Sequence, residues 1–378
     1  MSSVIEAAPG PAIATAAEEK IAVATQLQLT WWRFRKHKVA VVSAFIVAFF
    51  YLVAVFADFL AVSNPHATDA ARSYIPPQQI HWFDDGRFRP HVFALAGKRD
   101  MKTFKLVYVP DPNDKRYLTL FARGYPYRLF GLIPTDRHLV GLDRGDAQDA
   151  LFLLGTDQLG RDFWSRLMLA TRTSLVIGLA GVAISLFLGV LLGGLSGLYG
   201  GWLDTAIQRL IEILRSIPTI PLWMGLAAAL PASWSVLQVY LAITVIISLI
   251  GWTELARVVR GRFLSLREED FVTAAELAGA SRMRIIFRHM VPSFLSHIIA
   301  AVSLALPAMI ISETTLSFLG LGLRPPAISW GVLLQDAQNI QALGIAPWLL
   351  IAALPVIVVI LAFNFLGDGL RDAADPYG

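Results

Sequence analysis

The 378-residue sequence contains no cysteine and few charged residues. Without cysteine the chain has no disulfide, no thiolate zinc site and no cysteine nucleophile. Charged residues make up only 16% of the chain, against about 25% in soluble domains, so the polar surface of a soluble protein is missing. Hydrophobic residues make up 56% and lie in long runs, which is typical of a membrane protein with several spanning helices.

The common catalytic motifs are absent as well. No G-x-x-x-x-G-K-[ST] loop occurs, because Gly97-Lys98 has no glycine at the required upstream spacing, and neither H-E-x-x-H nor G-x-S-x-G is present. The chain therefore has no P-loop for ATP hydrolysis, and we expect no catalytic residue, cofactor or metal site in it. His81 and His91 lack metal-ligand spacing and are interpreted as free-standing surface histidines.

The formal net charge of +4 allows two interpretations. Excess lysine and arginine occurs in proteins that bind nucleic acid, but in membrane proteins these residues collect on cytoplasmic loops. Because the composition is that of a membrane protein, we favour the second interpretation. We expect the lipid bilayer as a partner and no nucleic acid.

Uncharged runs long enough to cross a bilayer, about 20 residues each, predict six spanning helices. They cover 39–57, 173–203, two stretches between 204 and 254 that turn near 231–234, 289–312 and 337–367. Pro218 and Pro221 are expected to kink or interrupt the third span. A cleaved signal peptide is the alternative for the first run, but the run is too long and follows a polar tail, which favours an uncleaved membrane anchor.

The distribution of arginine predicts the orientation. Loop 255–291 is rich in arginine and is expected in the cytoplasm, whereas the loop between the last two spans has Arg324 as its only cation and is expected outside. Six spans then place both the N-terminus and the C-terminus in the cytoplasm. Segment 63–154 is expected outside, and it escapes the charge rule because it is longer than about 60 residues.

The fold class that we predict is an all-α polytopic membrane protein with six transmembrane helices and a small β-containing extracytoplasmic insert. Its parts are a disordered cytoplasmic tail at 1–30, a first transmembrane helix with a basic flank at 31–62, the insert at 63–154, and a core of five further spans with the cytoplasmic loop 255–291 at 155–378. In the insert, 104–109 and 117–121 are predicted strands, with turn residues at 84–86 and 110–112.

Two patterns of small residues indicate close helix contacts. Gly189, Gly193, Gly197 and Gly201 recur at every fourth residue, which gives one helix face that another helix can approach, although we favour a flexible helix end for Gly197 and Gly201. In loop 255–291 a short helix is predicted after the acidic residues 268–270.

This short helix has a face of small residues, Ala274, Ala275 and Ala278, and Gly279 is placed to end it. Such a face is able to lie against another protein, but a helical hairpin at the membrane interface without a partner fits the pattern too. A second, basic helix is predicted at 281–288, and Pro292 fits the first turn of the next span.

The same loop resembles a known family. Ala274-Ala275-x-x-x-Gly279 followed by His289-Met290-Val291-Pro292 is similar to the coupling-loop signature of ABC importer permeases, and more narrowly of the C-type permease of dipeptide, oligopeptide and nickel importers. Further blocks that resemble this family lie at 32–38, 155–166, 313–331 and 364–376. Together the blocks cover 31–62 and 155–376, and the insert at 70–150 is longer than most members of the family carry.

The resemblance implies a type I importer permease in the bacterial cytoplasmic (inner) membrane. Its partners would be a second, B-type permease subunit, two ATP-binding-cassette ATPase subunits that bind the ATP, and an extracytoplasmic solute-binding protein that delivers di- or oligopeptides. Nickel, opine or oligosaccharide import by the same machinery is the alternative. A self-sufficient channel or secondary carrier, or a membrane enzyme, fits less well, because neither buried ion ligands nor a catalytic pair is evident.

The resemblance also implies roles for particular residues. Those expected to couple to the ATPase are Thr273, Ala274, Ala275, Ala278, Gly279 and Pro292. Thr273 stands where the signature often opens with glutamate, so this position has no carboxylate.

Glu313 and Ser317 are the candidate pathway or gate residues, because an acidic residue inside a span is costly and usually functional. A hydrogen-bonded anchor for the outer loop is the interpretation of Glu313 that we favour.

Overall fold

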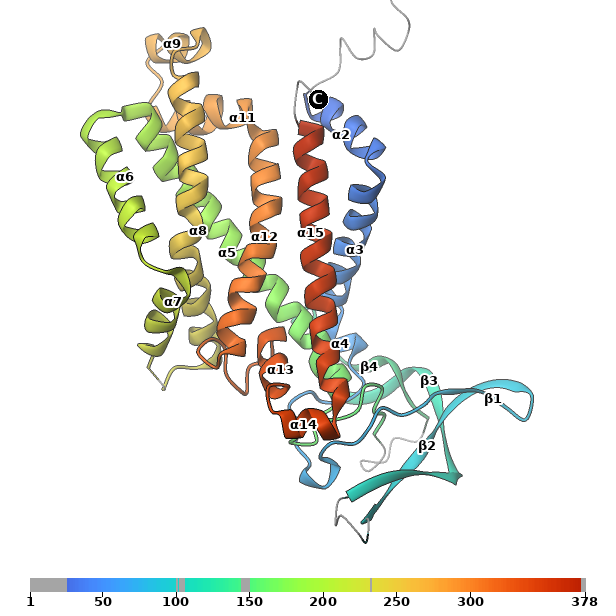
Figure 1. Ribbon diagram of the computed structural model, residues 1–378. Coiled ribbons are helices and arrows are strands. Elements are labelled where there is room, and N and C mark those ends of the chain that lie inside the picture. The colour runs from blue at the N-terminus through green and yellow to red at the C-terminus, as the bar shows by residue number, and fades with distance from the viewer. Residues whose placement is uncertain (1–25, 100, 102–105, 144–149, 232, 375–378) are drawn as a thin grey trace, which may run out of the picture.

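The computed structural model describes residues 26–99, 101, 106–143, 150–231 and 233–374. Long helices lie side by side as a bundle, and a β-sheet lies at one end of it (Figure 1). Helices α2 (Gln26–Lys36) and α9 (Asp270–Leu277) lie at the opposite end, together with the end of the last long helix, α15 (Ala353–Ala374). The predicted tail at 1–25 lies outside the described residues, and 26–30 belong to α2 rather than to a tail.

Among the described residues, five helices are long and apolar enough to cross a membrane. They are α3 (Lys38–Val55), α5 (Phe163–Tyr199), α8 (Val236–Leu266), α12 (Leu295–Phe318) and α15 (Ala353–Ala374) with the preceding η3 (Pro347–Ala352). Helices α6 (Gly201–Ser216) and α7 (Thr219–Ala228) add a sixth span if this pair, bent by 87°, is counted as one. The bend lies at Pro218, as predicted, because proline at this position caps α7 rather than continuing α6.

The structure corrects two span boundaries in the first half of the core. Helix α5 begins at Phe163 instead of 173, because Arg166 and Arg172 in its first turns pair with carboxylates and so do not stop the helix. Helix α8 continues to Leu266, so the first part of the predicted loop 255–291 is helical. The arginines of that part lie on a helix that extends beyond the apolar run.

The last two spans begin later than predicted. The π-helix η2 (Ile285–Met290) and the short α11 (Val291–Ser293) occupy the start of the expected fifth span, so Pro292 lies in α11 and not in the first turn of α12. The sixth span begins at Pro347 rather than 337. Before it, α13 (Trp330–Asp336) ends at Ala337 and α14 (Ile340–Ile345) forms a separate short helix, which leaves no continuous helix over 337–346.

Glycines bring α5 and α8 into close contact. A Cβ atom on Gly193 would lie 2.5 Å from the carbonyl oxygen of Ala256, and one on Gly197 would lie 2.6 Å from Cβ of Phe263. A flexible helix end is therefore the wrong interpretation for Gly197. Gly201 has a φ of +58° with open space around it, and it begins α6 after the turn.

The insert contains a four-stranded antiparallel sheet with the strands in sequence order. The strands are β1 (His81–Asp84), β2 (Arg87–Arg99), β3 (Leu106–Leu129) and β4 (Ile133–Leu142). The turn at 85–86 is confirmed, with positive φ at Asp85 and Gly86, but 110–112 lie inside the long β3 rather than in a turn. Helix α4 (Ala57–Leu60) and η1 (Ala70–Arg72) connect the first span to the sheet.

His91 is not a surface histidine. It is 3% exposed, and its ring packs beside His81, Phe93 and Tyr117 with ring centroids 5.4 to 5.8 Å apart. The pairing of β1 with β2 places His81 directly opposite His91. The two rings thus form part of a small aromatic core, which the sequence spacing did not predict because the partners come from three strands.

Candidate functional site

Helix α9 ends in a Schellman motif at the end of the bundle that is remote from the sheet. Gly279 has a φ of +77°, its N–H donates to the carbonyl of Glu276 at 2.9 Å, and the N–H of Ala280 donates to the carbonyl of Ala275 at 3.0 Å. Asp270 lies in the first turn, where a carboxylate stabilises the helix dipole. The helix therefore has well-formed ends although it is short.

One face of α9 is buried against the bundle. Val272 is fully buried and belongs to an apolar cluster with Ile285, Ile286 and Met290, which also contains Phe263 of α8. The same cluster includes residues of α5 and α12, namely Val190, Leu198 and Ile298. A force on α9 therefore reaches three spans through close-packed side chains, which transmit displacement because such cores have little free volume.

The opposite face of α9 is exposed. Thr273, Ala274, Ala278 and Gly279 are exposed and lie together, whereas Ala275 is half-buried against the apolar cluster. Sequence reasoning missed Leu277, whose side chain is 85% exposed at the end of the helix. Leu277 therefore adds a large apolar side chain to the exposed face of this helix.

Short-range contacts hold the two arms of this hairpin together. Arg282 pairs with the carboxylate of Glu276, and its guanidinium lies 5.7 Å from the ring centroid of Tyr199 at the end of α5. The Oγ1 of Thr273 donates to the carbonyl of Glu269 at 3.4 Å, so this hydroxyl is turned to its own helix. Pro292 lies in α11, which follows η2.

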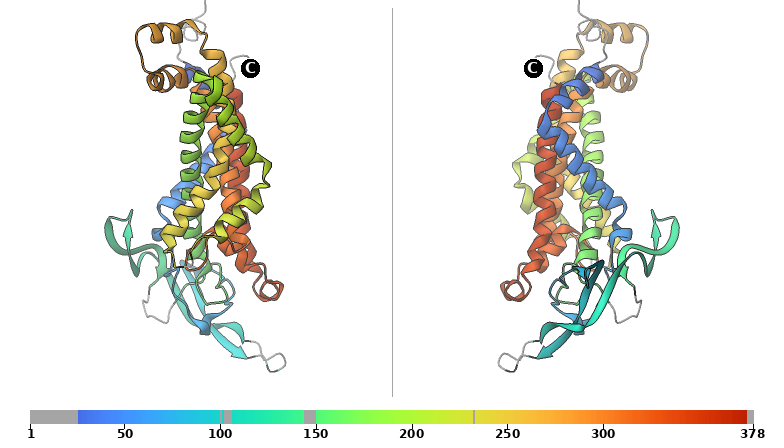
Figure 2. Two further views of the ribbon diagram at one scale, coloured as in Figure 1. Left: turned by 90° about the vertical axis from the view of Figure 1, so that its left-hand side faces the viewer. Right: turned by 90° about the vertical axis from the view of Figure 1, so that its right-hand side faces the viewer.

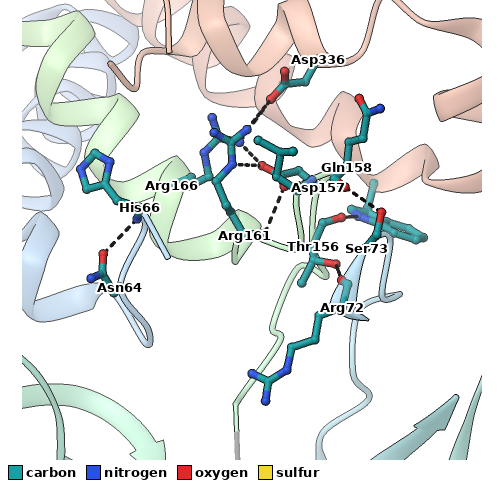
Figure 3. Close-up of polar contacts among 12 residues, drawn as sticks. Asn64, His66, Arg72, Ser73, Thr156, Asp157, Gln158, Arg161, Arg166 and Asp336 are labelled. Atoms are coloured by element: carbon teal, nitrogen blue, oxygen red, sulfur yellow. Dashed lines mark hydrogen bonds and ion pairs between the residues drawn. The ribbon is translucent and has the colours of Figure 1, made fainter. Parts of the chain in front are cut away.

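A cluster of buried charges lies at the sheet end of the bundle, and Figure 3 shows its members. We call Asp157, Arg161, Arg166 and Asp336 the outer charge cluster, after the side on which the sequence predicts this end of the bundle. Asp157 accepts from Nε of Arg161 at 2.7 Å and also pairs with Arg166, while Asp336 of α13 lies 3.2 Å from Nη1 of Arg166 and 3.6 Å from Nη2 of Arg161. Two arginines thus balance two carboxylates with little exposure, which ties the start of α5 to α13.

The loop before α5 is tied to the insert by further hydrogen bonds. The Oγ1 of Thr156 accepts from the N–H of Ile75 at 2.7 Å and donates to the carbonyl of Arg72 at 2.6 Å, and Ser73 Oγ donates to the carbonyl of Gln158 at 2.7 Å (Figure 3). Asp162 then caps α5 by accepting from the N–H of Ser165 at 2.7 Å. Burial raises the pKa of Asp162 to about 7.

Glu313 and Ser317 lie together, fully buried, at the same end of α12. Glu313 accepts from Ser317 Oγ at 2.8 Å and from Ser174 Oγ of α5 at 3.0 Å. These two hydroxyls in turn accept from backbone N–H groups of the outer loop and α13, at Leu323 (3.0 Å) and Trp330 (3.2 Å). The carboxylate is thus the centre of a network that holds the loop, and it is enclosed rather than open to a pathway.

A cavity of about 650 Å³ lies elsewhere, between α5, α8, α12 and the end of α15. Its walls are mostly apolar, and its ionisable lining residues are Glu254, Arg262 and Arg371. Neither Glu313 nor Ser317 lines it. Sequence reasoning treated Glu254 as the end of a span, whereas the structure places it well inside α8. No group of three histidine or carboxylate side chains suited to a metal ion occurs among the described residues.

Comparison with known proteins gives matches over most of the chain. Residues 189–377 match the family described as binding-protein-dependent transport system inner membrane component, and residues 25–77 match the N-terminal transmembrane domain of oligopeptide transport permease C. The oligopeptide transport system permease protein OppC of Bacillus subtilis is 33% identical over 77% of this chain and 87% of its own length. The protein of the same name from Escherichia coli strain K12 is 43% identical over 59% of this chain and 71% of its own.

One further relative and one solved structure also match. The glutathione transport system permease protein GsiD of Pectobacterium atrosepticum is 39% identical over 59% of this chain and 72% of its own. The inward-facing MetNI methionine ABC transporter covers 55% of this chain and 95% of its own at 17% identity, with a TM-score of 0.42, which is too low to carry an argument.

A polytopic helical bundle with these matches defines a permease subunit of an ATP-binding-cassette importer, a class of transport components rather than enzymes. The chain belongs to the family of binding-protein-dependent transport system inner membrane components. Within it, the matches identify a C-type permease of the dipeptide and oligopeptide branch. The predicted resemblance is confirmed.

Proposed function

We propose that this chain forms half of a transmembrane pathway for di- or oligopeptides. The relatives named above are permeases for oligopeptides or glutathione, and the cavity lined by α5, α8 and α12 has the mixed character that peptides require. Apolar walls accommodate varied side chains, while Glu254 and the two arginines offer charges of both signs to peptide termini. Nickel, opines and oligosaccharides are the alternative cargoes.

In this proposal the conformational change is driven by ATP binding to partner subunits. Residues Thr273, Ala274, Ala278 and Gly279, with Leu277, seat in a groove of an ATPase subunit. Ala275 packs on the apolar cluster beneath this face, and Pro292 belongs to α11, which continues the coupling segment. The observation that carries the proposal is that one face of α9 is exposed whereas Val272, on its other face, is fully buried in the apolar cluster. ATP-dependent closure of the partner then shifts α5, α8 and α12 between two packings.

The assembly proposed is a B-type permease beside this chain, two ATPase subunits at the α9 end and a solute-binding protein at the sheet end. Both chain termini lie in the cytoplasm, six spans cross the inner membrane, and 63–154 is extracytoplasmic. The arginines of α8 and the α9 hairpin support this orientation, because short cytoplasmic loops are enriched in lysine and arginine. The outer charge cluster and Glu313 hold the outer loop in register and serve as a structural anchor.

One pair of variants tests the coupling proposal in the assembled importer. Gly279 and Gly86 both have a φ of +77° and open space around Cα, so Gly279→Glu and Gly86→Glu introduce the same backbone strain and the same charge. We expect Gly279→Glu to abolish uptake of a labelled peptide while ATP hydrolysis persists, and Gly86→Glu to retain uptake. Full uptake by Gly279→Glu would contradict the coupling role of α9. Uptake of nickel or a sugar instead of peptide would contradict the proposed peptide cargo.

A further inference from the structure

The hairpin between β3 and β4 carries an apolar tip that no described part of the chain covers. Its tip residues Phe130, Leu132 and Ile133 are exposed by 53%, 80% and 57%. Phe121, nine residues before Phe130 on β3, is also exposed. A cluster of large apolar side chains at the end of a hairpin marks a contact with a protein or a membrane.

The position of the hairpin distinguishes these occupants. The ring of Phe130 lies 5.5 Å from that of Phe56, and the ring of Phe121 lies 6.0 Å from that of Phe59, at the end of the first span. Figure 2 shows the β3–β4 end of the sheet rising beside the lower ends of the helices, back toward the bundle. The tip is therefore level with the border of the apolar helices rather than remote from it.

The exposed surface continues from the hairpin along the first span. Helix α3 presents an apolar stripe whose members are at least half exposed: Val42, Phe45, Phe49 and Leu52. This stripe belongs to a helix that is apolar enough to span a membrane, and a bilayer would cover it. Phe56 and Phe130 extend the same surface without a break, so the occupant that fits both is lipid.

The backbone of the tip suits shallow insertion. Within lipid an unpaired backbone donor is costly, but the N–H of Gly131 donates to the carbonyl of Arg128 at 3.0 Å and that of Leu132 donates to Leu129 at 3.1 Å. Arg128 is exposed next to the tip, where its guanidinium is placed to meet phosphate headgroups. Aromatic and cationic residues are typical of this boundary.

The backbone conformation of two phenylalanines also supports a membrane contact. Phe121 and Phe130 both have a φ of +56°, a left-handed conformation that glycine or asparagine adopts more easily. Both strained residues contact phenylalanines that directly follow the first span, Phe56 and Phe59. Glycine would adopt this conformation with less strain, so the two rings are kept at a cost in backbone free energy.

A rigid contact holds the hairpin in this position. The buried ring of His138 on β4 is 3.0 Å from the carbonyl of Asp58 on α4 through Nδ1, and 3.0 Å from the carbonyl of Tyr125 on β3 through Nε2. The rings of Tyr125 and Tyr127 pack against the imidazole, with centroids 4.6 and 4.9 Å away. His138 thus fixes both strands of the hairpin to the end of the first span.

We propose that the β3–β4 tip, formed by Phe130, Leu132 and Ile133 beside Phe56, inserts into the headgroup region of the membrane leaflet on the sheet side. The insert is then a membrane-resting platform rather than a freely suspended domain. This proposal does not depend on the cargo or on the coupling at α9.

The absence of native cysteine allows a direct test with a spin label. Leu132→Cys and Ile133→Cys are labelled in the full chain and reconstituted in nanodiscs of phosphatidylethanolamine and phosphatidylglycerol. Met101→Cys is the matched control, because Met101 is an 88% exposed apolar residue of the same insert near the opposite end of β3. The measurement is the ratio of collision rates with oxygen, which partitions into lipid, and with a water-soluble nickel chelate.

We expect the ratio at both tip positions in nanodiscs to exceed that at Met101 several-fold. Equal ratios at the tip and at Met101 in nanodiscs would show that water covers the tip. Low collision rates with both reagents at the tip would show that protein covers it. Either result would overturn the proposal.

Discussion

Ser174 on α5 donates a hydrogen bond from its Oγ to the carboxylate of Glu313 on α12 over 3.0 Å, and both residues are fully buried. The same Oγ accepts from the N–H of Trp330, which is the first residue of α13. One hydroxyl therefore connects two spans to the loop that follows one of them. Glu313 is at the centre of this connection, and the geometry explains why an acidic residue is tolerated near the end of an apolar helix.

Glu313→Gln tests whether this residue is an anchor or a gate. The amide oxygen can still accept from one serine, but the second hydrogen bond is weakened, so we expect a loss of about 1 kcal/mol in unfolding free energy with uptake retained. Thermal unfolding and peptide uptake are the measurements, with the exposed Glu212→Gln of α6 as the control. Loss of uptake at unchanged stability would identify a gate instead.

Within the outer charge cluster, Arg166 and Asp157 are expected to be strongly coupled in their effects on stability. Arg166→Met leaves Asp157 buried with a partner missing, and breaking a buried ion pair in this way costs about 3–5 kcal/mol. The double variant Arg166→Met, Asp157→Asn is expected to recover part of the loss. Thermal unfolding of the single and double variants gives the coupling energy between Arg166 and Asp157. If the losses of stability in the single variants simply add in the double variant, the two residues do not interact as the structure shows.

The contact between α5 and α8 predicts opposite effects of alanine at two glycines. Gly193→Ala places Cβ 2.5 Å from the carbonyl oxygen of Ala256 and should destabilise the chain by about 1–3 kcal/mol. Gly225→Ala in α7 meets open space and should be neutral or stabilise by up to about 1 kcal/mol, because alanine favours the helix. Comparable melting temperatures for the two variants would mean that α5 and α8 are not packed this closely.

Asp162 predicts a pH dependence of stability. Burial raises its pKa to about 7 in the folded chain, so the folded state binds a proton more tightly than the unfolded state. The resulting stabilisation is fully present below the unfolded pKa of about 4 and is lost as the pH rises through the folded pKa.

Asp162→Asn keeps an oxygen that can accept from the N–H of Ser165 but does not ionise. The melting temperature of the variant minus that of the wild type should therefore increase from pH 5 to pH 8. A difference between wild type and variant that is constant with pH would show that this carboxyl does not titrate in the range.

Local patterns predicted the parts of this structure that depend on local rules. Proline at 218 predicted the break between α6 and α7, and Gly279 predicted the end of α9, because each of these residues restricts the backbone in its own way. The uncharged runs located the spans because a bilayer requires length and apolar composition.

The remaining features depend on partners that are distant in sequence. Arg166 enters a span because Asp336, 170 positions away, helps to balance its charge, and His91 is buried because β1 and β3 supply aromatic neighbours. The π-helix η2 displaced Pro292 from the predicted span, and no propensity marks such a helix. Leu277 was missed because an exposed leucine is recognisable only once the face of α9 is known.

The central claim is that the exposed end of α9 contacts an ATPase subunit. The most direct measurement places the photoreactive amino acid p-benzoylphenylalanine at position 277 in the assembled importer, with position 101 in the insert as the control. Irradiation should join position 277 to an ATPase subunit, in a yield that changes when ATP is bound, and position 101 should give no such product. A product between position 277 and the solute-binding protein, or none with the ATPase, would contradict the account.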